Sequence, residues 1–102
     1  MQQNIYQPGF YGNLKPSEIR ERLLADGFDP MQINDPPAYI YPAHHHPETK
    51  LLAFLSGGMD VLVADQMYHC GIGDRLLIPG NVEHSAQVTG DGCVYFWSEK
   101  LV

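Results

Sequence analysis

Histidines are the side chains of this sequence whose spacing most clearly indicates metal binding. His44, His45 and His46 are consecutive near the middle of the chain. Side chains alternate between the two faces of an extended strand, so His44 and His46 point the same way and His45 points to the opposite face. Two imidazoles on one face, about 7 Å apart by the strand rise, can bind one metal ion. The sequence therefore predicts a metal-binding pair that needs a third ligand from elsewhere in the chain.

His84 is the candidate for that third ligand. It follows a Pro79-Gly80-Asn81 turn and begins a predicted strand of its own, which a barrel could bring opposite the pair. His69 stands beside Cys70 at the end of another predicted strand, and no motif there relates it to the histidine pair. We expect His45 to face outward, and His69 and Cys70 to form the end of an exposed strand.

The elements that must position these histidines are short strands. From residue 39 onward, runs rich in Val, Ile, Leu and aromatic residues alternate with turns that contain Gly, Asn and Asp. Strands at this spacing predict an antiparallel sandwich or barrel. The predicted strands cover residues 39–46, 50–55, 59–63, 66–70, 75–78, 84–88 and 93–97.

One helix is predicted, over residues 15–27. Pro16 or Ser17 can begin it and Gly27 can end it. A narrow apolar stripe indicates a helix that lies on a larger surface. The stripe consists of Ile19, Leu23 and Leu24.

The other segments before residue 39 are predicted to lack regular structure. We expect the first dozen residues to form an arm across another surface, and residues 28–37 to form a loop because of their prolines. A length of 102 residues with 44% hydrophobic residues fits one globular domain. Within it, residues 1–36 are expected to be an arm and helix that pack on a barrel of residues 37–102.

Charge and hydropathy exclude several classes of partner. The chain has 12 acidic and 6 basic residues and a formal net charge of −6, with no basic cluster to neutralise phosphates, so neither nucleic acid nor a membrane is an expected partner. Apolar runs are too short to span a bilayer, and residues 1–4 lack the basic start of a signal peptide. We therefore expect a cytoplasmic protein in which Cys70 and Cys93 are free thiols.

Two motifs around the histidines resemble those of the cupin family. The second cupin motif has a Gly, a Pro-x-Gly turn and a metal-binding His at fixed intervals, and the residues at those intervals here are Gly73, Pro79, Gly80, Asn81 and His84. The first motif has paired histidines and the Gly of the following turn, and the residues at its intervals are His44, His46, Lys50 and Gly57. The resemblance implies an all-β fold, a jelly-roll barrel with one short N-terminal helix and a central pocket.

The resemblance also implies a metal. In most cupins a divalent ion is bound by two histidines and a Glu of the first motif and by the His of the second, which implies His44, His46 and His84 as ligands of Fe, Mn, Zn or Ni. Lys50 stands where the metal-binding Glu is expected. An ammonium beside a dication disfavours either the metal or the protonated lysine. Smaller departures from the motifs occur at Ala38, Asn81 and Val88.

Three arrangements around Lys50 are open. Lys50 is deprotonated or turned away, which leaves a three-histidine site with open coordination positions. Alternatively, Glu48 supplies the carboxylate, because strict alternation places it on the face of His44 and His46 unless Pro47 introduces a bulge. In the third arrangement there is no metal, and Lys50 binds an anionic ligand in the pocket.

Two functions are compatible with this pattern. The first is an enzyme, a metal-dependent dioxygenase or isomerase that acts on a small organic molecule. The second is a non-catalytic module that senses or carries a small ligand, since the fold by itself does not select a reaction. Small cupins commonly pair, so the resemblance implies a homodimer, with which the N-terminal arm and outward aromatic residues agree.

Overall fold

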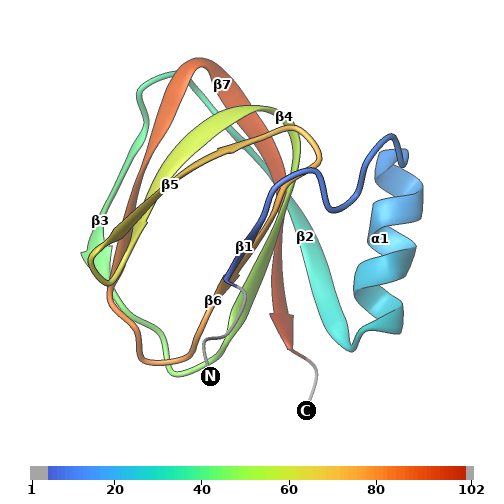
Figure 1. The fold of residues 1–102 in the computed structure, drawn as a ribbon, viewed down its shortest axis with the longest axis horizontal. Helices are drawn as coiled ribbons and strands as arrows, with labels where there is room; N and C mark the ends of the chain where they lie inside the picture. Colours follow the sequence, from blue (N-terminus) through green and yellow to red (C-terminus); the bar gives the residue numbers. More distant parts are fainter. Residues whose placement is uncertain (1–4, 101–102) are drawn as a thin grey trace.

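The computed structural model describes residues 5–100, and in them the strands curve around a common interior with one helix outside (Figure 1). The predicted all-β barrel with a short N-terminal helix is confirmed. Residues 1–4, whose lack of a signal-peptide start entered the prediction, lie outside the described residues. The elements are β1 (Tyr6–Gln7), α1 (Pro16–Ala25), β2 (Phe28–Asp35), β3 (Ile40–His44), β4 (Lys50–Val63), β5 (Gln66–Gly71), β6 (Arg75–Ile78) and β7 (His84–Lys100).

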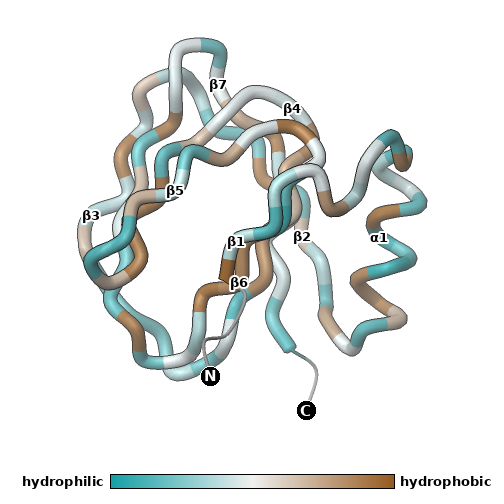
Figure 2. Tube along the Cα trace, in the orientation of Figure 1, coloured by the Kyte–Doolittle hydropathy of each residue, from teal (hydrophilic) through white to brown (hydrophobic). Residues whose placement is uncertain are grey.

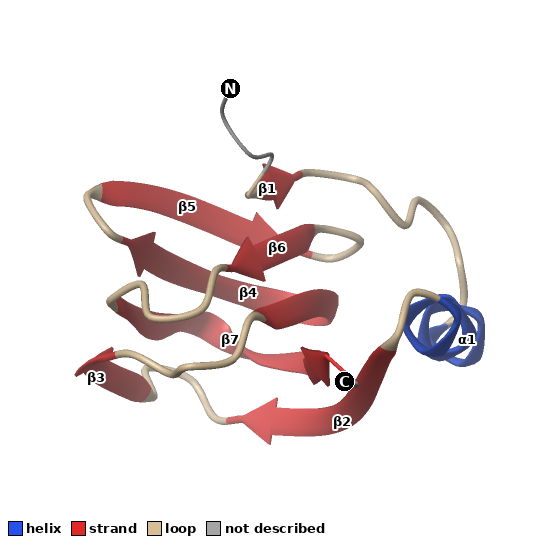
Figure 3. Cartoon of the chain, turned by 90° about the horizontal axis from the view of Figure 1, so that it is seen from below, coloured by secondary structure: helices blue, strands red, loops and turns tan. Residues whose placement is uncertain are grey.

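Two long strands, β4 and β7, form the centre of the sheet. The strand order is β1-β6-β4-β7-β2, with β3 added on β7 and β5 on β4, and every pairing is antiparallel. The first part of β4 pairs with β6 and its second part with β5, while β7 pairs first with β3 and then with β2. Because each long strand changes partner along its length, the sheet wraps around the interior, as the view from below shows (Figure 3).

The segment predicted as a loop over residues 28–37 is mostly strand β2, so that prediction was wrong. Phe28 pairs with Lys100, and the ladder runs without a break to Asp35 opposite Cys93. Proline is tolerated in a strand that pairs on one side only, which explains how Pro30 fits here. The pairs Tyr6–Leu76 and Gln7–Arg75 likewise place β1, inside the predicted arm, in the sheet.

Two apolar clusters hold the molecule together. One lies in the interior between the strands, with Phe54, Leu76 and Tyr95 among its members. The other lies between α1 and the outer face of the sheet, where Leu23 packs with Phe96. Hydrophobic and hydrophilic segments alternate along α1, as expected of a helix with one packed side (Figure 2).

The apolar stripe of α1 is narrower than predicted. Ile19 and Leu23 are buried, whereas Leu24 is 46% exposed. Consecutive helical positions are rotated by about 100°, which turns Leu24 away from the face that Leu23 presents. In the described part of the chain, no helix has the length and apolarity needed to cross a membrane.

The two adjacent leucines provide a matched test of this packing. Leu23→Ala removes a side chain with 0% exposure and should lower the free energy of unfolding by about 2–5 kcal/mol. Leu24→Ala makes the same chemical change on the exposed side and should alter the free energy of unfolding by about 0.5 kcal/mol or less. Urea denaturation followed by circular dichroism measures both values. Equal losses of stability in the two variants would contradict the packing of α1 on the sheet through Leu23.

Candidate metal centre

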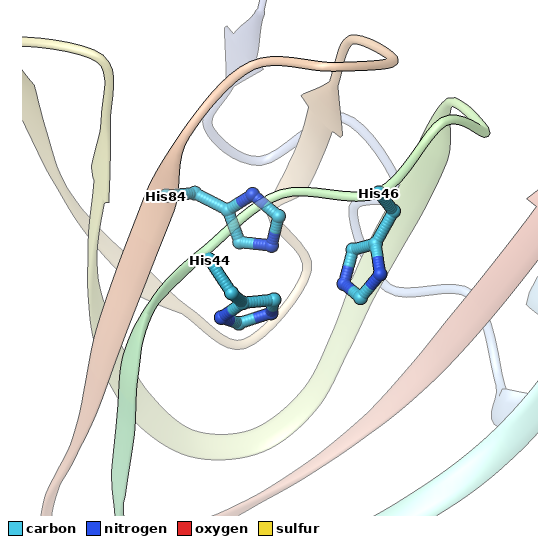
Figure 4. A group of neighbouring side chains, drawn as sticks. All are labelled: His44, His46 and His84. Carbon is cyan, nitrogen blue, oxygen red and sulfur yellow. The ribbon is translucent and has the colours of Figure 1, made fainter.

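Three histidines from two distant parts of the chain converge at one end of the barrel interior. His44 is the last residue of β3, His46 lies in the loop that follows, and His84 begins β7, where it is the register partner of His44. Ring centroids are 4.3 Å apart for His44 and His84, 4.7 Å for His44 and His46, and 5.2 Å for His46 and His84. Their potential ligand atoms all lie within 4.8 Å of one another (Figure 4).

Backbone carbonyls orient two of these rings. His44 Nδ1 donates to the carbonyl oxygen of Pro42 at 2.6 Å, and His84 Nδ1 donates to that of Val82 at 3.0 Å. A carbonyl oxygen can only accept, so in a neutral ring each Nδ1 carries the proton and each Nε2 keeps a lone pair. Metal-binding histidines are commonly oriented in this way, by a hydrogen bond from the nitrogen that does not bind the ion.

The free nitrogens fit a metal ion. Among the described side chains, Nε2 of His46 and Nε2 of His84 are buried and have no hydrogen-bond partner. A buried polar atom without a partner is costly, and a cation bound to the lone pair would remove that cost. The three-imidazole donor set suits the divalent transition metals that the sequence predicts.

Burial keeps the ring nitrogens available for binding. It lowers the pKa of His46, and the neighbouring His44 and His84 rings and Lys50 lower it further. Burial also lowers the pKa of His84, in part offset by the hydrogen bond to the Val82 carbonyl. The rings of His46 and His84 therefore stay neutral at lower pH than an ordinary histidine, and a neutral imidazole is the form that binds a metal.

A mostly apolar cavity of about 350 Å³ adjoins the histidines inside the barrel. This volume lies within the range of about 300–1,000 Å³ that is usual for small-molecule pockets. Five strands contribute to the walls. The lining residues are Met31, Ile33, Tyr41, His44, His46, Leu52, Met59, Val61, Ile78, His84, Ala86, Tyr95 and Trp97.

Lys50 is paired with carboxylates and is not among the residues that line this cavity. Its side chain is buried, with Nζ 2.8 Å from Glu99 Oε1, 3.6 Å from Glu48 Oε1 and 5.3 Å from the centroid of the Trp97 ring. The pairing with Lys50 holds the pKa of Glu99 below its usual range. Both carboxylates thus compensate the charge of the Lys50 ammonium.

Glu48 is exposed and also lies outside the histidine cluster. Strand alternation placed Glu48 on the face of His44 and His46, but β3 ends at His44 and β4 begins at Lys50. Residues 45–49 form a loop around Pro47, so the alternation does not extend to Glu48.

The remaining predicted residues are spread over the surface and the core. His45 is exposed, as expected. His69 is also exposed, and its Nδ1 lies 2.8 Å from Asp60 Oδ1, whereas Cys70 is buried, contrary to the expectation for this strand end. Cys70 and Cys93 are free thiols, and burial raises the pKa of both.

Asp35 is the residue near the cavity that sequence reasoning missed. It accepts a hydrogen bond from Tyr41, whose hydroxyl also lies 2.9 Å from that of Tyr95. The sequence predicts a core or interface role for its alternating aromatic residues and a pocket role for some of them, and both Tyr41 and Tyr95 line the cavity. No pattern in the sequence indicated Asp35, because it belongs to the segment that was predicted to be a loop.

The comparisons with known proteins agree with this architecture. A family model described as the AraC-like ligand binding domain matches residues 31–99, which is more than half of the chain. The chain belongs to this family. This AraC-like domain has the cupin fold that the two motifs predicted, and the three histidines of those motifs lie close together. No curated protein matches the sequence.

Solved structures that resemble this AraC-like domain are distant in sequence. A protein of unknown function from Streptococcus pyogenes, SPY1581, has a TM-score of 0.65 and 13% identity over 74% of this chain and 66% of that one. An RmlC-like cupin from Shewanella frigidimarina has a TM-score of 0.67 and 17% identity over 74% of this chain and 68% of that one. Protein NMB1881 from Neisseria meningitidis has a TM-score of 0.60 and 25% identity over 72% of this chain and 74% of that one. The chain thus spans just under two thirds of the length of SPY1581.

Gly80 offers a test of how the loop that carries His46 is held. Gly80 N donates to Thr49 Oγ1 at 3.1 Å, Asn81 N donates to the His46 carbonyl at 2.6 Å, and a Cβ on Gly80 would collide with the Pro47 carbonyl. Gly80→Ala should displace the loop and weaken Zn²⁺ binding by roughly tenfold to a hundredfold, the usual effect of losing a support of a metal ligand. Calorimetric titration measures this affinity.

Gly90→Ala is the matched control for this substitution. A Cβ at Gly90 would meet no atom within 4 Å, so its Zn²⁺ affinity should equal that of the wild type. Equal affinities for all three proteins would show that the turn does not position His46.

Proposed function

We propose that the chain binds one divalent metal ion through His44, His46 and His84, and a small organic molecule in the adjoining cavity. The convergence of three imidazoles, with buried and unpartnered Nε2 atoms on His46 and His84, carries this proposal. Three protein ligands leave coordination positions that a ligand oxygen can occupy. A divalent ion bound there would polarise that oxygen.

The environment of Lys50 supports a three-histidine site over the two alternatives. Its Nζ is paired with Glu99 and Glu48, so the ammonium does not face the histidines as an uncompensated charge. Glu48 is engaged by the same pair, which speaks against its use as a fourth metal ligand. Lys50 also does not line the cavity, which speaks against a direct contact between its ammonium and an anionic ligand.

Membership of the AraC-like ligand-binding domains and the apolar cavity favour ligand binding as the primary role. Ligand binding needs only shape, apolar contact and a few directed polar groups, and the cavity offers all of these. Dioxygenase or isomerase activity is the second candidate, favoured by the open coordination positions. The cytoplasmic location and the homodimer stay predictions from the sequence.

Elemental analysis of protein prepared without an affinity tag or nickel resin tests the metal site. We expect about one divalent ion per wild-type chain, loss of that ion in His84→Ala, and retention in Glu48→Gln. His69→Ala is the control, because it removes an exposed histidine outside the cluster. Wild-type protein without metal after growth in supplemented medium would refute the proposal, as would equal metal contents in His84→Ala and His69→Ala.

Oxygen uptake tests for dioxygenase activity. Iron-loaded protein is supplied with a panel of small thiols and diketones, and His84→Ala serves as the blank. We expect uptake equal to that of the blank, which would favour ligand binding or isomerisation over oxygenation. Uptake above the blank would assign an oxygenase to this site.

A further inference from the structure

A chain of three polar side chains runs along the cavity wall away from the histidine cluster. Tyr41 Oη donates to Asp35 Oδ2 at 2.6 Å, and the hydroxyl oxygens of Tyr41 and Tyr95 are 2.9 Å apart. The three residues come from β3, β2 and β7. Both tyrosines line the cavity, whereas Asp35 does not. The carboxylate therefore lies behind the two phenols, as seen from the cavity.

The carboxylate sets the direction of every proton in this chain. Ionised Asp35 can only accept, so the single hydroxyl proton of Tyr41 is directed to it. Tyr41 then has no proton left for Tyr95, and Tyr95 must donate to Tyr41. Burial and the hydrogen bond to Asp35 raise the pKa of Tyr41 to about 12, and burial with the bond to Tyr41 raises that of Tyr95 further. Both phenols thus keep their protons, and both protons are used within the chain.

The two phenol oxygens consequently present lone pairs, and no O–H group, to the cavity. The other polar groups among the described lining residues are the three histidines and the indole of Trp97. The Trp97 ring lies 5.6 Å from that of His46, at the histidine end. The remaining walls are aliphatic or thioether side chains, and none of the described lining residues carries a carboxylate or an ammonium.

The two polar regions are separated along β3. Tyr41 precedes His44 by three residues, which corresponds to at most about 10 Å along a strand. A small molecule in a cavity of about 350 Å³ can therefore reach both regions at once. At the histidines it meets a metal-binding site, and at the tyrosines it meets acceptors only.

We propose that the cavity selects a small, largely apolar molecule that has an oxygen at one end for the metal ion and a hydroxyl or N–H group at the other for Tyr95 and Tyr41. This inference rests on the proposed function. A donor at the tyrosine end gives its proton to a phenol oxygen. An acceptor at the same place faces lone pairs and stays unsatisfied, and such a mismatch is what a polar pocket rejects most strongly.

Two hydroxamates of similar size serve as probes on zinc-loaded protein. Both bind zinc through the hydroxamate group, and they differ only at the far end of a benzene ring. 4-(Hydroxymethyl)benzohydroxamic acid carries a donor there, and 4-acetylbenzohydroxamic acid carries only an acceptor. We expect the wild type to bind the donor probe roughly tenfold more tightly, as measured by isothermal titration calorimetry.

Substitutions in the hydrogen-bonded chain should remove that preference. In Tyr41→Phe/Tyr95→Phe both acceptors are gone, so the two probes should bind equally. In Asp35→Asn the amide can donate to Tyr41, which allows the chain to reverse and frees the Tyr95 proton for the cavity. The acceptor probe should then gain on the donor probe, although Asp35 itself does not line the cavity.

Tyr39→Phe is the matched control, because Tyr39 is 46% exposed and does not line the cavity. It should keep the wild-type preference. Circular dichroism and metal content verify that each variant is folded and loaded.

The outcomes separate this inference from the proposed function. Equal binding of both probes by wild-type protein would overturn the inference and leave ligand binding at the metal intact. A preference that survives in both Asp35→Asn and the double tyrosine variant would also overturn it. If neither probe binds to protein that carries one zinc ion, the proposed function fails and the inference fails with it.

Discussion

The site depends on the antiparallel register that joins β3 to β7 at the rim of the barrel. This register sets His44 directly opposite His84, so that the two rings share one face of the sheet at 4.3 Å between centroids. Antiparallel neighbours hold side chains about 5 Å apart without help from the side chains themselves. The backbone ladder therefore establishes two thirds of the ligand set. Only His46 has to be placed by a loop.

That loop is held by a second backbone feature, the turn that precedes β7. The Asn81 amide bonds the His46 carbonyl, and Asn81 adopts a φ of 64°, a conformation that Asn tolerates better than most residues. The same turn leads directly into His84. Two ligands of the proposed site thus share one support, which explains why the second motif combines a tight turn with a histidine.

The sequence predicted the position of a site residue where residue type and local spacing determine it. It did not predict the position where pairing between distant strands determines it. The grouping of the three histidines agrees with the motif spacing, because His44 and His84 lie at strand ends and pair in register. His46 lies beyond the end of β3, so strand alternation does not account for its position. Glu48 could not be placed, since the strand period ends at His44 and the next element begins at Lys50. The partner of Lys50, Glu99, comes from the far end of β7, and no local pattern connects residues so distant.

A similar limit applied to β2 and Asp35. The prolines of residues 28–37 favour a loop by local propensity. An edge strand, however, needs backbone hydrogen bonds on one side only, so it can contain proline. The strand was recognisable only from its pairing with residues 93–100 of β7, which are distant in the sequence. A polar residue behind a cavity wall is equally invisible to local patterns, because its role depends on what lies between it and the cavity.

The irregular stretch of β7 gives the domain a particular freedom in evolution. Between the pairs Met59–Val88 and Gly57–Cys93, β7 has four residues where β4 has one, and Gly90 there has open space around it. Elsewhere in β7, adding or removing one residue would turn every later side chain to the opposite face, and Tyr95 and Trp97 would leave the cavity while His84 stayed. Residues 89–92 can absorb such a change in length. An insertion at residues 89–92 would therefore lengthen this stretch while Tyr95 and Trp97 keep facing the cavity.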